Sequence, residues 1–357
     1  MKHIVFLLPG SAWKPIGGLK VVYEYANRMV NDGYAVTITY AASFFFSSCS
    51  FKKKIRSLVK YVYFAVSRKY TCRAWFDLDN RIREEWVWSL SERQVPGADI
   101  YFATAVETSY YLDRYKMVDR VNKYYLIQHF ENWSYSDRFV LDSYHLNLKK
   151  IVISGWLQDI MKQEQETCVL IRNGFDPAYF ISYKPVEDRD KFHISMLYHE
   201  AEWKGCEDAF EALEIVKRKY PQLMVSLFGG FPEPQLPDWM TYYRKPDRTL
   251  HNRIYNESSI YIGASHSEGF GLTVGEAMLC GCAVACTDNK GYLEMAKDSE
   301  TALVSPVKKP NELADNIMRL IENDELRYRI AGNACTYISQ FTWDESYNRL
   351  KELLRSF

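Results

Sequence analysis

Short apolar runs alternate with amphipathic stretches along most of the chain, and this alternation predicts buried strands separated by helices. Apolar residues at helical spacing from Val21 to Met29, for example, lie between the first two runs. The runs that predict strands in the first half are Ile4–Leu8, Val36–Thr39, Asp99–Phe102, Lys123–Ile127, Lys150–Ile153 and Cys168–Ile171. Their order indicates a Rossmann-like half, although no G-x-G-x-x-G fingerprint of a dinucleotide site accompanies it.

The second half repeats the alternation. Its expected strands are Phe192–Leu197, Leu223–Phe228, Ser259–Ile262, Cys282–Ala285 and Thr301–Val304. A length of 357 residues suits two domains with a core each. The charged segment Pro177–Asp190 is expected to link them. We therefore expect an N-terminal domain at 1–182 and a C-terminal domain at 183–341, followed by a helix at 342–357.

The helix expected between Phe51 and Tyr70 is strongly basic. Its basic residues are Lys52, Lys53, Lys54, Arg56, Lys60, Arg68 and Lys69, and they surround an apolar stripe of Ile55, Leu58, Val59, Val62 and Val66. This pattern is typical of a helix on an anionic membrane, where each Lys or Arg contributes about 1 kcal/mol. The alternative is a helix that packs on its own sheet with its charges in solvent. The preceding Phe44–Phe46 fit either a membrane contact or a core.

Composition excludes several partners. Lys and Arg together number 45, as do Asp and Glu, so nucleic acid is not an expected partner. The cluster Cys280, Cys282 and Cys286 surrounds a predicted buried strand and is expected to be core rather than a metal site, and unpaired cysteines suit a reducing cytosol. Ile4–Leu8 is too short for a signal sequence, and no run approaches the ~20 residues that span a bilayer. We expect a soluble or peripheral protein.

The candidate chemistry follows the strand Ser259–Ile262. The stretch reads Glu268-Gly269-Phe270-Gly271-Leu272-Thr273-Val274-Gly275-Glu276, so two glutamates flank the start of a predicted helix. Glycines let the backbone approach a ligand, and the first amides of the helix, near Gly271, Leu272 and Thr273, have no intrahelical partner. Such a helix start suits a diphosphate, with about 0.3–1 kcal/mol from each contact with the helix dipole.

The two glutamates suit hydroxyl groups, because a carboxylate repels phosphate. Glu268 at the start of the motif and Glu276 about one turn into the helix can each accept hydrogen bonds from a polyol. A diphosphate between two polyols describes a nucleotide sugar. The alternative is a glycine-rich loop with two solvated glutamates.

The block E-G-F-G-L-x-x-x-E-A-M-x-x-G-C that begins at Glu268 resembles the E-x7-E signature of family 4 of the retaining glycosyltransferases. Further similar blocks are Gly17-Gly18, Asn173–Asp176 with Phe180, Trp203–Gly205, and Thr287-Asp288 with Gly291. These blocks cover most of the chain in the order of the family. The resemblance implies the GT-B fold, an α/β architecture of two Rossmann-like domains with a cleft between them, in which the last helix crosses back to the first domain.

The resemblance also implies roles for single residues. Glu268 would contact the donor sugar and act in catalysis, and Glu276 would bind the ribose. Lys204 matches a lysine on the donor diphosphate, whereas His199 stands where the family usually has an arginine. The loop at Gly17 and Gly18 would face the cleft near the acceptor and the donor phosphates, and Gly269–Thr273 would bind the donor. His129 resembles the histidine of the family's cleft near the donor sugar and the acceptor, and it would act in catalysis with Glu268 and Lys204, although a lone histidine is more often structural.

These observations predict a retaining, metal-independent hexosyltransferase. It would move a hexosyl or deoxyhexosyl unit from a nucleoside-diphosphate sugar to a glycan or lipid-linked glycan in polysaccharide biosynthesis, in the cytoplasm or on the inner face of the cytoplasmic membrane. The loop Gln128–Trp133 resembles that of bacterial surface-polysaccharide enzymes. The D-x-D pair Asp77-Leu78-Asp79 lacks phosphate-loop features, so neither a metal nor a cofactor besides the substrate is expected. A phosphorylase, an epimerase and a non-catalytic membrane-binding protein are the alternatives.

Overall fold

The computed structural model describes residues 1–42, 51–119 and 122–355, with residues 51–54 described by their backbone alone. The aromatic residues Phe44–Phe46 lie outside the described residues. Contacts between Cα atoms divide the chain into two compact units, one of Met1–Arg172 with Tyr347–Phe357 and the other of Asn173–Ser346. The domain boundaries expected from the sequence, and a cleft between the domains, stay predictions.

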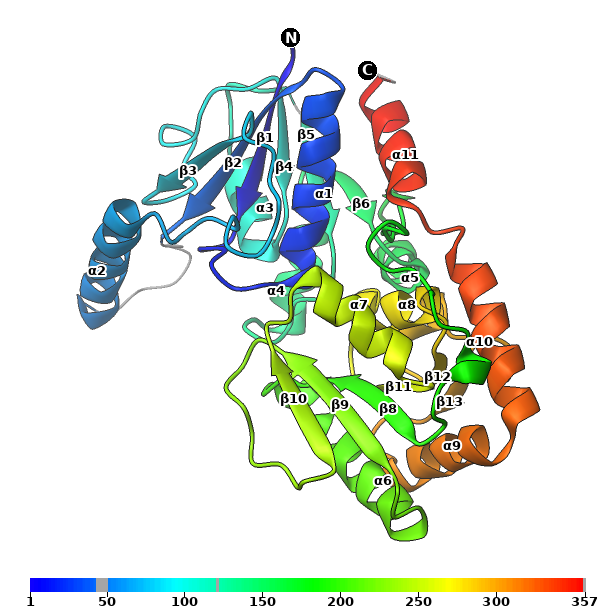
Figure 1. The fold of residues 1–357 in the computed structure, drawn as a ribbon. Helices are drawn as coiled ribbons and strands as arrows, with labels where there is room; N and C mark the ends of the chain where they lie inside the picture. Colours follow the sequence, from blue (N-terminus) through cyan, green and yellow to red (C-terminus); the bar gives the residue numbers. More distant parts are fainter. Residues whose placement is uncertain (43–50, 120–121, 356–357) are drawn as a thin grey trace. The chain divides into compact units, whose positions relative to one another are not determined.

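The first unit contains a parallel sheet, which has seven strands in the described residues, in the order β3-β2-β1-β4-β5-β6-β7 (Figure 1). The strands are β1 (His3–Leu8), β2 (Ala35–Ala41), β3 (Arg83–Val87), β4 (Ile100–Ala103), β5 (Lys123–Ile127), β6 (Lys149–Val152) and β7 (Cys168–Leu170). The helices are α1 (Gly17–Asn31), α2 (Phe51–Ser67), α3 (Val106–Asp113), α4 (Asp137–Tyr144) and α5 (Gly155–Gln163). The strand order reverses between β1 and β4.

The second unit contains another parallel sheet, with six described strands in the order β10-β9-β8-β11-β12-β13. The strands are β8 (His193–Leu197), β9 (Met224–Gly229), β10 (Met240–Arg244), β11 (Ile260–Gly263), β12 (Ala283–Thr287) and β13 (Leu303–Ser305). The helices are α6 (Cys206–Lys219), α7 (Arg248–Glu257), α8 (Leu272–Leu279), α9 (Pro310–Glu322) and α10 (Asp324–Ile338). The order reverses between β8 and β11, so the two sheets share one topology and the predicted α/β fold class is confirmed.

The core of the second unit lies between its sheet and the helices that cover it. Ile194 and Ile262 of neighbouring strands, Leu213 of α6 and Ile317 of α9 are all buried in one cluster. Periodic apolar positions therefore predicted the central strands correctly. They did not predict the edge strands β3 (Arg-Glu-Glu-Trp-Val) and β10 (Met-Thr-Tyr-Tyr-Arg), because neither contains a run of buried apolar residues.

The charged segment Pro177–Asp190 is fixed to the second unit by Arg189. The guanidinium group is only 5% exposed and donates to the carbonyl oxygens of Lys184 (2.8 Å), Tyr255 (3.1 Å), Ser258 (3.0 Å) and Cys280 (2.6 Å). One cation thus satisfies backbone carbonyls from four places in the chain, and the segment is part of the folded unit rather than a free tether.

The last helix, α11 (Trp343–Arg355), contributes its residues from Tyr347 onward to the first unit. There the hydroxyl of Tyr347 and the ammonium group of Lys351 each donate to a carboxylate oxygen of Asp32 at 3.0 Å. The hydrogen bond from Lys351 is the largest cause that lowers the pKa of Asp32. This carboxylate therefore anchors the end of the chain to the C-terminus of α1.

We predict that Arg189→Met lowers the free energy of unfolding by about 3 kcal/mol, because it leaves several buried carbonyl groups without a donor. Denaturant unfolding of the variant measures this loss. Arg218→Met, at an exposed position of α6, is the matched control and should change stability by less than about 0.5 kcal/mol. Equal stability of the two variants would contradict the role of Arg189.

Candidate functional site

The candidate site lies where the strand order of the second sheet reverses. β8 and β11 are neighbours, with Ile194 paired to Ile260, and the loops that follow them both leave the carboxyl edge of the sheet. The first loop carries His199 and Lys204, and the second carries Glu268. Open parallel sheets bind ligands at such a reversal, because the two loops diverge there and leave a crevice.

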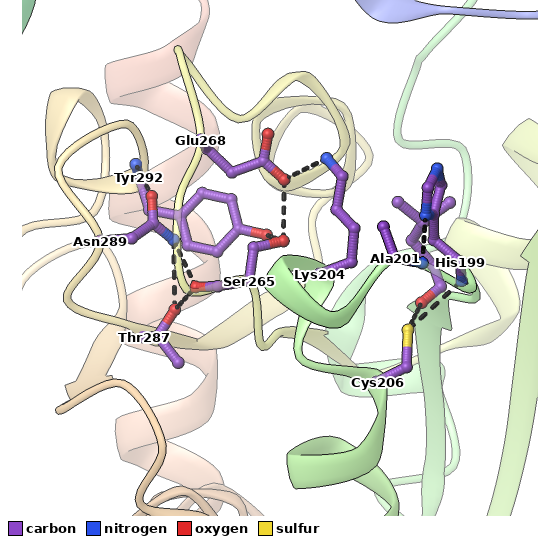
Figure 2. A network of polar contacts seen from close by, with 10 residues as sticks. His199, Ala201, Lys204, Cys206, Ser265, Glu268, Thr287, Asn289 and Tyr292 are labelled. Carbon is purple, nitrogen blue, oxygen red and sulfur yellow. Dashed lines mark hydrogen bonds and ion pairs between the residues drawn. The ribbon is translucent and has the colours of Figure 1, made fainter. Parts of the chain in front are cut away.

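An ion pair joins the two loops (Figure 2). The ammonium group of Lys204 lies 2.6 Å from Oε1 of Glu268, and the two side chains are only 20% and 15% exposed. Lys204 ends the short 3-10 turn Glu202–Lys204 in the loop that follows β8. Limited exposure to water strengthens the attraction between the two charges. A cation and a carboxylate are thus fixed side by side next to the start of α8.

A hydrogen-bonded chain also orients Glu268, and it ends at the same carboxylate oxygen that Lys204 contacts. The hydroxyl of Ser265 donates to Oε1 of Glu268 at 2.8 Å, and the hydroxyl of Tyr292 donates to the hydroxyl of Ser265 at 3.0 Å. Burial raises the pKa of Tyr292 well above its usual value, which keeps this donor protonated. The side-chain amide of Asn289 donates to the carbonyl of Ser265 at 2.9 Å. The carboxylate is therefore pre-organised.

Helix α8 begins at Gly271 without a side-chain cap. Gly271 has φ of 94°, and a Cβ at this position would lie 2.5 Å from Cδ1 of Tyr292, so only glycine fits. Leu272 and Thr273 at the helix start are only partly buried. The first amides of the helix have no intrahelical acceptor, and the positive end of the helix dipole lies there. This is the arrangement that the sequence predicted for a diphosphate.

Phe270 lies deeper than its place in the motif suggested. Its side chain is 2% exposed and stacks near the rings of Phe175 (centroids 6.1 Å apart) and Phe341 (6.2 Å). Phe175 also closes over α8, where a Cβ on Gly275 would lie 2.0 Å from its Cζ. The side chain of Phe270 is thus a core anchor, and its backbone is the part that can contact a ligand.

Glu276, the second acid of the motif, lies one turn inside α8. It is 5% exposed, and the hydroxyl of Tyr255 lies 3.5 Å from its Oε2. Burial raises the pKa of Tyr255 well above its usual value, so Tyr255 stays a hydrogen-bond donor. A carboxylate with so little exposure suits a hydrogen bond to a bound hydroxyl group better than contact with bulk water.

His199 is a neutral member of the site. Its Nδ1 accepts a hydrogen bond from the amide of Ala201 at 3.0 Å, which places the ring proton on Nε2. Burial, followed by the nearby charge of Lys204, lowers the pKa of His199 to about 4. The thiol of Cys206 accepts from the amide of His199 at 3.3 Å and fixes the backbone there (Figure 2). His199 can therefore donate one hydrogen bond but supplies no positive charge at neutral pH.

The other predicted site residues lie at the carboxyl edge of the first sheet. Gly17 begins α1, and the carbonyl of Gly18 accepts a hydrogen bond from Nε2 of Gln128 at 3.0 Å. His129 follows β5 and lies edge-on to the rings of Trp133 (centroids 5.1 Å apart) and Trp156 (5.8 Å). Gly17, Gly18 and His129 thus gather in the first unit, and His199, Lys204 and the motif gather in the second.

Sequence reasoning missed the residues that support the acids. Ser265 lies 24 residues before Asn289 and 27 before Tyr292, and the three match no motif of spacing, although Tyr292 follows Gly291 in one of the similar blocks. It also missed the pair of Asp208 and His266, whose Oδ2 and Nε2 lie 2.6 Å apart. The one signal in the sequence was that the loops after the strands β8, β11 and β12 were expected at the same carboxyl edge of the sheet.

Comparison with known proteins identifies a matching family model and several relatives. Residues 181–336 match the family model described as "Glycosyl transferases group 1". The chain is 24% identical over 255 residues to N,N'-diacetylbacillosaminyl-diphospho-undecaprenol alpha-1,3-N-acetylgalactosaminyltransferase of Campylobacter jejuni, covering 64% of this chain and 66% of that protein. It is 25% identical over 192 residues to phosphatidyl-myo-inositol mannosyltransferase of Mycobacterium tuberculosis, covering 49% of this chain and 50% of that protein. The chain thus spans about two thirds of the length of the first of these curated relatives and about half of the length of the second.

The fold of the whole chain has solved counterparts. Anabaena Alr3699/HepE, in a crystal structure with UDP and glucose, has a TM-score of 0.74 to this chain at 17% identity, with 100% of both chains covered. The resemblance inferred from the E-x7-E block is therefore confirmed. The chain has the GT-B fold, and the group 1 model matches its residues 181–336.

Proposed function

We propose that this protein is a retaining, metal-independent glycosyltransferase that uses a nucleoside-diphosphate sugar as its donor. The observation that carries the proposal is the ion pair of Lys204 and Glu268, fixed at the reversal of the second sheet beside the uncapped start of α8. The ammonium group of Lys204, the first amides of α8 and the oriented carboxylate of Glu268 thus lie on two neighbouring loops. A diphosphate next to a sugar is the ligand that uses all three.

The donor would bind with its diphosphate against the amides of Leu272 and Thr273 and the ammonium group of Lys204. Glu268 would then accept hydrogen bonds from the transferred sugar, and Glu276 would accept them from the ribose. HepE, which shares the fold, has been crystallised with UDP-glucose, and this supports a nucleotide sugar as the ligand class. The transferred unit would be a hexose or deoxyhexose.

In the reaction, the bond between the anomeric carbon and the β-phosphate oxygen breaks, and a bond to the acceptor oxygen forms on the same face of the sugar. The leaving phosphate takes the proton of the acceptor hydroxyl. The charge that develops on the diphosphate is stabilised by Lys204 and by the helix amides, so these groups do the work of a metal ion. Glu268 orients the sugar and does not attack it.

The acceptor would bind to the first unit. His129 lies at the carboxyl edge of its sheet, next to the half-exposed ring of Trp133, and an indole face suits a sugar ring. We infer that the acceptor is a glycan or a lipid-linked glycan of the cell envelope and that the enzyme works in the cytoplasm or on the inner face of the cytoplasmic membrane. The names of the relatives from Campylobacter jejuni and Mycobacterium tuberculosis, which specify lipid-bearing acceptors, support this inference.

We predict that one nucleoside diphosphate in a panel of UDP, GDP and dTDP raises the melting temperature by several degrees, because a ligand at 100 times its Kd stabilises the folded state by ~2.7 kcal/mol.

Glu276→Gln should weaken binding of that nucleotide about tenfold, because a neutral amide accepts a weaker hydrogen bond from the ribose. Glu300→Gln, at an exposed position, is the matched control. A panel without any shift would contradict the proposed donor site.

We predict that Glu268→Gln lowers turnover about 100-fold, since Glu268 orients the transferred sugar. Release of nucleoside diphosphate in the presence of acceptor measures turnover, again with Glu300→Gln as control. Full turnover in Glu268→Gln would rule out the assigned role. Dependence on inorganic phosphate would indicate a phosphorylase, and a changed sugar that stays on its nucleotide would indicate an epimerase.

We predict that His199→Arg binds the nucleoside diphosphate about tenfold more tightly, because it adds a permanent charge next to Lys204. Isothermal titration at pH 7.5 measures the affinity, and His145→Arg on the surface of the first unit is the control for added charge. Unchanged affinity in a well-folded His199→Arg would place the diphosphate away from this loop.

A further inference from the structure

Helix α2 exposes an apolar face to solvent. Ile55, Leu58, Val59, Val62 and Val66 are 47%, 54%, 63%, 52% and 81% exposed. Their spacing of three and four residues places all five on one side of the helix. The sequence left open whether this stripe packs on the sheet, and the structure shows that it does not. Isolated exposed aliphatic residues are common on protein surfaces, but five on one face form a contiguous patch.

The exposed face is not the result of a loosely held helix. The opposite face contacts the edge strand β3, next to which α2 lies in Figure 1. Phe64 is buried with its ring 5.3 Å from that of Trp86, and Nε1 of Trp86 donates to the carbonyl of Tyr61 at 3.0 Å. Tyr61 also meets Trp88 edge-on at 5.6 Å. Aromatic contacts therefore fix the rotation of the helix and point its aliphatic stripe outward.

The charges around the stripe have a single sign. No Asp or Glu occurs between Asp32 and Asp77, although the chain as a whole has as many acidic as basic residues. The basic residues of this interval are Lys52, Lys53, Lys54, Arg56, Lys60, Arg68, Lys69 and Arg73. Arg73 forms an ion pair with Glu84, and the other seven belong to α2 or directly follow it. Arg56 and Lys60 are exposed along one border of the stripe.

We propose that this face of α2 binds the surface of an anionic lipid bilayer, with the five aliphatic side chains at the acyl boundary and the basic side chains among the headgroups. A bilayer uses both features of the face, because apolar burial and attraction to anionic lipid add together. A second copy of the chain would bring two basic faces together, so like charges oppose that occupant. Among the described residues, no helix is long and apolar enough to cross a membrane.

This inference goes beyond glycosyl transfer, because vesicle binding needs neither donor nor acceptor. The experiment is co-sedimentation of the full chain with vesicles of phosphatidylcholine alone or with 30% phosphatidylglycerol, at low and high salt. We expect binding to the anionic vesicles, at least tenfold weaker binding to the neutral ones, and loss of most binding in high salt.

Two pairs of substitutions separate the contributions of the face. Leu58→Ser with Val62→Ser should weaken binding to anionic vesicles at least tenfold, because both side chains lose their apolar contact. Arg56→Gln with Lys60→Gln should weaken it about tenfold on anionic vesicles and leave binding to neutral vesicles unchanged. Val169→Ser with Met224→Ser, at exposed apolar positions on β7 and β9, is the matched control and should bind as the unaltered chain does.

All these positions are exposed, although Lys60 also lies close to the ring of Phe64, and melting temperatures check that every variant is folded. Equal binding to both kinds of vesicle, or full binding by the Leu58→Ser and Val62→Ser variant, would overturn the proposal. So would a dimer in size-exclusion chromatography that this variant converts to a monomer, since the face would then join two copies.

Discussion

The attraction between Lys204 and Glu268 is the interaction on which the candidate site depends. It connects the two loops that leave the sheet where its strand order reverses, and it does so with little exposure to water. Two opposite charges in such a place neutralise each other, so neither carries the full cost of burial alone. Hydrogen bonds from Tyr292 to Ser265 and from Ser265 to Glu268 orient the carboxylate. The ion pair therefore fixes the two loops relative to each other and holds both charges where a diphosphate and a sugar would meet.

The distribution of charge in this crevice is unusual in one respect. His199 stands where a second cation is expected, and its burial keeps it neutral. The positive potential is therefore supplied by Lys204 and by the start of α8, where the backbone rather than a side chain contributes. A site of this kind relies on fixed dipoles, which need no reorganisation when charge develops on a leaving group.

The sequence predicted the central strands, the two-sheet architecture and the position of the two acids, because each depends on local spacing of apolar residues or on one contiguous motif. It did not predict β3, whose polar residues suit an edge position, nor the support of Glu268 by Tyr292, which is brought near only by the fold. Phe270 shows the same limit, since spacing placed it at the ligand while the structure buries its ring. The outward direction of the α2 stripe was likewise invisible, because a periodic pattern defines a face but not what covers it.

The contact between Phe175 and Gly275 links two parts of the chain that are distant in sequence. The phenylalanine ring occupies the space that a side chain on α8 would otherwise fill. One position can therefore enlarge only if the other shrinks, and the two should vary together as relatives diverge. Helix α8 also carries Glu276. A mismatch between Phe175 and residue 275 would therefore tilt the helix and shift this carboxylate. Selection on nucleotide binding would then extend to the ring of Phe175.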